Sequence, residues 1–146
     1  MNKVFFDLEW NTGFLDGNSF DEIIEIGAVK TDEEYRQIDG FRRLIRPVIY
    51  RKMNPYIQKI LAITMKDLQG EEPLASVAKA FFDWCGDCDT LIAWSGNDFG
   101  VLEKNLAHIG MKIPEQLGRY DVQMAYAYRT ENSIRNYALK AAGEAM

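Results

Sequence analysis

The chain has 146 residues, 47% hydrophobic and 27% charged, a composition that is ordinary for one soluble globular domain. Its net charge of -5 excludes a coat protein that binds nucleic acid through bulk positive charge. No apolar run approaches the ~20 residues of a membrane span, and the N-terminus lacks the pattern of a signal peptide, so we expect a cytoplasmic protein without membrane contact.

Three strands are predicted in the first third of the chain. Val4–Trp10 carries apolar residues on both faces, which is typical of a central strand covered on each side. The Gly-, Asn- and Asp-rich stretch 11–19 predicts a loop and 22–30 predicts a second strand. A third strand over 37–46 ends at Pro47. The short turns between these strands indicate an antiparallel meander.

Helices alternate with short strands in the rest of the chain. Apolar residues at helical spacing predict a short helix around Ile57, and Pro73 begins a longer helix that reaches Trp84. The later elements are a strand over 91–94, a helix from 97 to about 109, a strand or helical turn over 120–128, and a helix over 134–142. This order predicts an α/β fold with a mixed sheet, a three-strand antiparallel meander plus parallel strands, flanked by helices.

Two carboxylates share one face of the first strand. Alternate residues of a strand point the same way, so Asp7 and Glu9 stand side by side while Phe6 and Leu8 face the other way. On an exposed edge strand both carboxylates would be solvated at no cost. On a covered central strand they would repel and lose hydration, at several kcal/mol per ion, unless a cation held them. Oxygen ligands favour Mg²⁺ or Mn²⁺.

A third acidic residue begins the helix that follows the 91–94 strand. Phe99, Leu102 and Leu106 recur at helical spacing and predict its buried stripe, which places Asp98 in the first turn. There the carboxylate either caps the helix and complements its dipole, or projects toward the first strand beside the other two carboxylates.

Cys85 and Cys88 stand in the motif Trp-Cys-Gly-Asp-Cys, a spacing found in thioredoxin-type redox proteins. In that fold the first Cys lies where a strand ends and a helix begins, so the helix N-terminus stabilises the thiolate. Here the predicted order is inverted, with a helix before the cysteines and a strand after them. A zinc site would require two further ligands. We therefore expect two thiols in a helix-to-strand turn, and no redox pair.

Basic residues cluster near the end of the third strand. Five cations fall within eleven residues with no acid among them, namely Arg42, Arg43, Arg46, Arg51 and Lys52. They predict either a patch that contacts phosphates or a solvated strand face whose alternate residues pack inward. Trp10 lies beside the carboxylates and is either a core residue or a platform for a terminal base.

Taken in order, the motifs resemble the DEDD family of 3′–5′ exonucleases, of the DEDDh type, which have a ribonuclease-H-like fold. The resemblance covers residues 1 to about 128. It rests on Phe6-Asp7-Leu8-Glu9, the strand Ile23–Val29, Ile63-Thr64 with Asp67-Leu68, Gly96-Asn97-Asp98-Phe99 with Leu102, and Tyr120-Asp121. In that family the position of Asp121 marks a strand end that is not usually a metal ligand.

The resemblance implies one ribonuclease-H-like exonuclease domain over residues 1–146 that hydrolyses phosphodiester bonds at DNA or RNA 3′ ends. Two Mg²⁺ or Mn²⁺ ions would be held by Asp7, Glu9 and Asp98, one activating water and the other stabilising the leaving oxygen. We expect the nucleic acid to contact Trp10, Asn11, Thr12, Arg42, Arg43 and Arg46.

One family feature is missing. The third motif, a His or Tyr a few residues before a fourth Asp, should follow the last predicted helix, and the only histidine, His108, is expected in mid-helix and half-exposed. The chain thus resembles either a form without the C-terminal segment of the domain or a natural variant without the fourth Asp and the general base. In both cases we expect a site for one ion and weak cleavage. The alternative function is a non-catalytic ribonuclease-H-like module that binds nucleic acid, a protein partner or a second copy.

Overall fold

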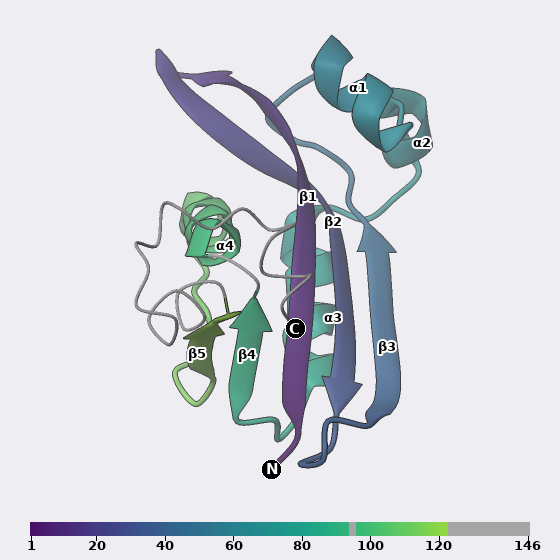
Figure 1. The fold of residues 1–146 in the computed structure, drawn as a ribbon. Coiled ribbons are helices and arrows are strands. Elements are labelled where there is room, and N and C mark those ends of the chain that lie inside the picture. Colours follow the sequence, from purple (N-terminus) through teal and green to yellow (C-terminus); the bar gives the residue numbers. More distant parts are fainter. Residues whose placement is uncertain (94–95, 123–146) are drawn as a thin grey trace, which may run out of the picture.

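Five strands form one mixed sheet in the order β3-β2-β1-β4-β5, with α3 behind it (Figure 1). The computed structural model describes residues 1–93 and 96–122. The strands are β1 Lys3–Leu15, β2 Asn18–Thr31, β3 Gln37–Leu44, β4 Thr90–Ala93 and β5 Gly118–Asp121. The helices are α1 Pro55–Leu61, α2 Met65–Gln69, α3 Leu74–Cys85 and α4 Gly96–His108.

The strand pairing confirms the predicted sheet. The pairs β1–β2 and β2–β3 are antiparallel, whereas β1–β4 and β4–β5 are parallel, and β1 is central. The predicted ends of α3, β4 and α4 agree with the structure to within one residue. The predicted helix over 134–142 lies outside the described residues. No helix in the described ranges is both long and apolar enough to cross a membrane.

The first hairpin is longer than predicted, and the loop expected over 11–19 is wrong. β1 and β2 pair as far as Leu15 and Asn18, so that only Asp16 and Gly17 form the turn. Their φ angles are 53° and 81°, as an Asp-Gly hairpin turn with two left-handed residues requires. This stretch is polar because the hairpin extends beyond the core, and the backbone pairing of the two strands tolerates polar side chains.

A register shift divides the hairpin into two parts. Glu9 pairs with Glu25 but Trp10 pairs with Ile23, so Ile24 is an extra residue in β2, a β-bulge. β4 joins β1 only over 3–5 and β3 joins β2 only over 25–31. Residues 10–15 and 18–23 therefore pair only with each other among the described strands. This part, which we call the distal ribbon, curves away above α4 (Figure 1).

The main core lies on the face of β1 opposite Asp7. Phe6 and Leu8 are 5% and 3% exposed, and the Phe6 ring packs against Phe81 of α3 and Phe99 of α4 at centroid distances of 6.5 and 5.2 Å. The predicted alternation along β1 is thus confirmed. Asp7 is exposed, so the opposite face is less covered than the sequence suggested.

Buried polar side chains attach the loop after β3 to the distal ribbon. The Glu22 carboxylate, 4% exposed, accepts hydrogen bonds from the backbone N–H groups of residues 48–50 at 2.8 to 3.0 Å. Asn11 is fully buried; its side chain accepts from the backbone N–H of Asn54 and donates to the carbonyl of Lys52. This loop leads into α1.

A second apolar cluster supports the two short helices. Ile24, the bulged residue, packs there with Met53 and Leu68. The sequence predicted α1 but not α2. The latter begins with a capping box in which Thr64 and Asp67 bond to each other's backbone N–H groups.

Candidate active site

Asp98 is the buried centre of a group of carboxylates. It lies in the first turn of α4, is 7% exposed, and has a pKa raised to about 7. Burial is the largest cause of this rise, followed by the negative charges of Asp7, Glu9 and Asp121. The pKa of Glu9 is also raised, by burial and then by Asp7 and Glu25. Asp7, Glu9 and Asp98 therefore affect one another electrostatically, as neighbours around one site do.

The packing beneath each carboxylate explains its position. The two on β1 are fixed by the buried Phe6 and Leu8, which alternate with them. Asp98 is fixed by Phe99 and Leu102, 7% and 1% exposed, which hold the first turns of α4 against the sheet. The helix follows β4, which is the parallel neighbour of β1.

Sequence reasoning did not include Asp121 in this group. It ends β5 and pairs with Ala93, the last residue of β4. Because the carboxyl ends of parallel strands meet at one edge of a sheet, Asp121 lies at the edge where α4 begins. The position of β5 beside β4 would have indicated that Asp121 belongs to this group. The sequence pattern over 120–128, however, fits a strand and a helical turn equally.

The donor set fits a hard divalent cation in its chemistry. All of the groups are carboxylates, and the charged residues that shift the pKa of Asp98 are all negative. A bound cation would therefore offset the repulsion between these negative charges. As they stand, no three His, Cys, Asp or Glu side chains within 1–93 and 96–122 form a group that could hold a metal ion. Coordination would therefore require side-chain rearrangement.

Replacing Asp98 by Asn should stabilise the metal-free protein at pH 8. The folded state holds the carboxyl with a pKa of about 7, above its ordinary 3.8, so ionisation costs stability as the pH rises from about 4 to 7 and the cost is constant above that. We expect a gain of about 1–3 kcal/mol at pH 8 and little difference at pH 4. Thermal unfolding in EDTA measures it.

Asp16→Asn removes the same charge from the exposed hairpin turn and is the matched control. Equal melting temperatures for Asp98→Asn and wild type at pH 8 would contradict the assigned burial of an ionised Asp98.

The expected nucleic-acid contacts of β1 lie in different environments. The side chain of Asn11 is fully buried and accepts a hydrogen bond from the backbone N–H of Asn54 in the loop after β3. Thr12 Oγ1 donates a hydrogen bond to Asp21 Oδ1 at 3.0 Å. Trp10 is half-buried and packs at the margin of the main core. Trp10 also lines a cavity between this hairpin and α4.

The three expected arginines do not share one surface. Residues 42 and 43 point to opposite faces of β3, and only Arg42 lies on the face of Glu9. Arg42 Nε lies 2.5 Å from Glu25 Oε2, an ion pair whose angles are not those of a hydrogen bond. Arg46 is exposed, and its backbone N–H donates to Glu72 before α3. Arg42 thus reaches diagonally to Glu25, the cross-strand neighbour of Glu9, and so one arginine lies close to the carboxylates.

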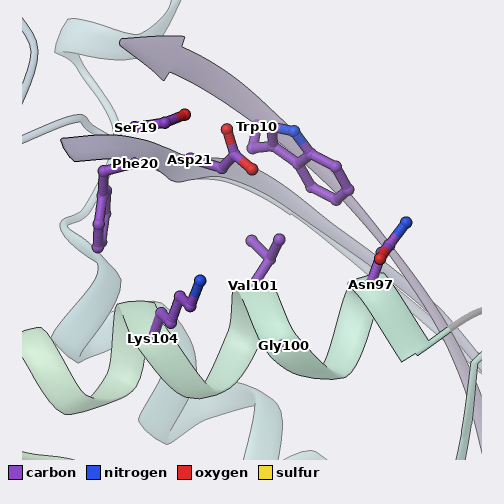
Figure 2. A pocket seen from close by; sticks show the side chains of 8 residues that line it. All are labelled: Trp10, Ser19, Phe20, Asp21, Asn97, Gly100, Val101 and Lys104. Carbon is purple, nitrogen blue, oxygen red and sulfur yellow. The ribbon is translucent and has the colours of Figure 1, made fainter. Parts of the chain in front are cut away.

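A cavity of about 340 Å³ separates the distal ribbon from α4. Trp10, Phe20 and Asp21 belong to the ribbon side, and Asn97 and Lys104 to α4 (Figure 2). Two residues that line the cavity are chain neighbours of the carboxylates: Trp10 follows Glu9, and Asn97 precedes Asp98.

The two cysteines are free and buried, one at the end of α3 and one before β4. Burial raises the pKa of Cys85 to about 12 and also raises that of Cys88, so neither thiol is a reactive thiolate at neutral pH. We expect Cys85→Ala/Cys88→Ala to leave any nuclease activity of the chain unchanged, and the wild type to lack disulfide reductase activity. Reductase activity that disappears in the double variant would contradict this.

The model of the exonuclease family RNase_T matches residues 4–144. A PolC-type DNA polymerase III from Clostridium perfringens is 34% identical over 112 residues. That match covers 75% of this chain and 7% of the polymerase, so the chain corresponds to a small part of that relative.

Solved structures share the fold. The nuclease domain of 3′hExo, a DEDDh family member bound to rAMP, is 18% identical with a TM-score of 0.77, over 92% of this chain and 72% of that one. A full-length 3′-exonuclease has a TM-score of 0.80 at 17% identity, over 95% and 67%. Exonuclease I of E. coli, in complex with a dT13 oligonucleotide, has a TM-score of 0.66 at 17% identity, over 87% and 29%.

Proposed function

This chain belongs to the RNase_T exonuclease family, and from that premise we propose that it removes nucleotides from the 3′ end of a DNA or RNA strand by hydrolysis. The observation that carries the proposal is the electrostatic grouping of Asp7, Glu9 and Asp98 at the junction of β1 and α4. These are the three acids that the family resemblance marks for catalysis.

We propose Mg²⁺ or Mn²⁺ as the cofactor, held by Asp7, Glu9 and Asp98. A bound cation supplies a Lewis acid and lowers the pKa of water. The chain's own contribution is positional: β1 presents two carboxylates on one face, and α4 presents the third from a buried first turn. Asp121 adds negative charge to the same region and favours cation binding there.

Support for the substrate comes from structural relatives. One is bound to rAMP and another is in complex with a dT13 oligonucleotide, so this fold accommodates both ribose and deoxyribose ligands. The present chain carries the corresponding fold and three carboxylates, which supports a nucleic-acid 3′ end as substrate without a choice between DNA and RNA.

The direct test uses single-stranded DNA and RNA oligonucleotides of one sequence, labelled at the 5′ end and incubated with Mn²⁺. Progressive shortening from the 3′ end, stopped by EDTA and by a blocked 3′ terminus, is the expected result. Internal cleavage would overturn the exonuclease assignment. Tight binding without any cleavage would instead favour the non-catalytic nucleic-acid-binding module.

A further inference from the structure

Arg42 lies on the same face of the sheet as the carboxylates of β1. Asp7 pairs with Gly27 of β2, and Gly27 pairs with Arg42 of β3, so these three residues form one row across the strands. Residues that are directly opposite one another share a face of the sheet. Adjacent strands are about 4.8 Å apart, which places the Cα atoms of Asp7 and Arg42 about 10 Å from each other.

The strand between Asp7 and Arg42 carries no side chain in this row. A Cβ placed at Gly27 would meet no atom of the described residues within 4 Å. The surface above β2 is therefore open between the carboxylate of Asp7 and the guanidinium of Arg42, and a small anion there would not meet a side chain of β2.

Glu25 holds the guanidinium close to the carboxylates. It lies directly opposite Glu9, at a position where Cβ atoms are about 4.5–5.5 Å apart. Because Arg42 Nε lies 2.5 Å from Glu25 Oε2, the guanidinium leans from its own row toward Glu9. The side chain of Glu25 is only 13% exposed, whereas that of Arg42 is 74% exposed. A mostly buried carboxylate thus anchors a guanidinium that remains open to solvent.

The guanidinium keeps its hydrogen-bond donors available for a ligand. Among residues 1–93 and 96–122, the side chain of Arg42 forms this one ion pair, whose angles are not those of a hydrogen bond. The planar fork of an arginine matches the oxygens of a phosphate, and such charge-assisted hydrogen bonds are stronger than neutral ones. Arg42 can therefore bind a phosphate while Glu25 holds it in place.

We propose that Arg42 is a catalytic residue that contacts the scissile phosphate, and that Glu25 is its positioning residue. The inference rests on the proposed function, which places that phosphate beside Asp7, Glu9 and Asp98. Water attacks the phosphorus, the bond to the 3′ oxygen of the upstream nucleotide breaks, and this oxygen leaves with a proton. Arg42 offsets the negative charge that develops on the other phosphate oxygens, and it then holds the 5′-phosphate of the released mononucleotide.

Binding of the product tests this contact without hydrolysis. Thymidine 5′-monophosphate carries the phosphate that Arg42 contacts, and thymidine lacks it. In calorimetric titrations with Mg²⁺ present, we expect Arg42→Gln to weaken binding of the monophosphate about tenfold or more and to leave binding of thymidine unchanged. An unchanged affinity for the monophosphate, or an equal loss for both ligands, would overturn the proposal.

Arg36→Gln is the matched control. The side chain of Arg36 is also 74% exposed and pairs through Nε with a carboxylate, that of Asp32, at 2.8 Å. It lies in the turn between β2 and β3, and seven residues of extended chain, about 23 Å, separate Asp32 from Glu25. Arg36→Gln should bind both ligands as wild type does. A loss equal to that of Arg42→Gln would assign the effect to overall charge and overturn the proposal.

The kinetic effect should fall on the chemical step. We expect Arg42→Gln to lower kcat for a labelled oligonucleotide about 10²-fold or more, because an arginine at the reacting phosphate acts mainly in the transition state, and to change KM little. Arg42→Lys keeps the charge without the fork and should recover part of the loss. An unchanged kcat in Arg42→Gln would overturn the catalytic role.

A double-mutant cycle tests the positioning role of Glu25. Glu25→Gln keeps the shape of the side chain and removes the charge that anchors Arg42. The loss of monophosphate affinity caused by Arg42→Gln should therefore be smaller in the Glu25→Gln background than in the wild type. Equal losses in the two backgrounds would overturn this half of the proposal.

The same measurements separate failure of this inference from failure of the proposed function. If the wild type shortens oligonucleotides and Arg42→Gln does so at the same rate, the proposed function stands and the inference fails. If the wild type shortens no oligonucleotide but binds the monophosphate through Arg42, the exonuclease assignment and the catalytic role fail, while the phosphate contact stands.

Discussion

Asp7→Asn should reduce the Mn²⁺-dependent removal of 3′ nucleotides by about 10³-fold or more. A metal ion contributes several kcal/mol of transition-state stabilisation, and each 1.36 kcal/mol corresponds to a factor of ten in rate. Asn keeps the shape of the side chain but removes the negative charge that the cation requires. Initial rates on a labelled oligonucleotide measure the effect, and calorimetric titration with Mn²⁺ should show that binding is lost.

The fold should not suffer from this substitution, because Asp7 is exposed and its neighbours Phe6 and Leu8 provide the packing of β1. Asp16→Asn, in the exposed turn of the same hairpin, makes the same chemical change and should keep full activity. A rate for Asp7→Asn close to that of Asp16→Asn would remove Asp7 from the proposed catalytic site.

Hydrolysis by the 146-residue chain should be slow, and imidazole in the buffer should accelerate it. A positioned general base contributes about 10²–10⁴-fold. The family resemblance implies a His or Tyr before a fourth Asp for this role, and we matched no such pair among these 146 residues. The expected result is a rate that rises with the concentration of imidazole base at constant pH and ionic strength. A rate that does not respond to imidazole would contradict the missing-base explanation.

His108 provides the control for this experiment because it is the only histidine in the chain. It is exposed and ends α4, rather than lying half-exposed in mid-helix as predicted, and its ring centroid lies 5.8 Å from that of Phe20. Ten residues of helix place it about 15 Å from Asp98 along the axis. His108→Ala should therefore leave the rate unchanged, and a large loss would contradict this expectation.

The local pattern of β1 was sufficient to predict its two faces. Phe6 and Leu8 alternate with Asp7 and Glu9 with the period of a strand, and in the structure Phe6 and Leu8 are buried whereas Asp7 is exposed and Glu9 is partly exposed. Asp98 was placed at a helix start by the same kind of local signal. The grouping of the three carboxylates needed strand order as well, which the family resemblance supplied.

Long-range partners explain what the sequence did not show. Asn11 resembled a loop residue beside the site, but its hydrogen-bond partners lie more than forty positions away, at 52 and 54. Glu22 likewise holds backbone N–H groups at 48–50. Alternation on β3 separates Arg42 from Arg43, although their proximity in sequence suggested one patch. Each of these outcomes depends on the folded arrangement of the hairpin and the loop.

The distal ribbon is a part of the molecule whose length can change during evolution. A ribbon of two strands is marginal by itself, so its free energy of local opening should be lower than that of the five-stranded part, and its amides should exchange hydrogen sooner. The β-bulge at Ile24 lies between the ribbon and the pairs that include Asp7 and Glu9. Residues can be added to or removed from the ribbon in cross-strand pairs, two at a time, without a change of register at the carboxylates. The length of the ribbon can thus change in evolution while Asp7 and Glu9 keep their places in the sheet.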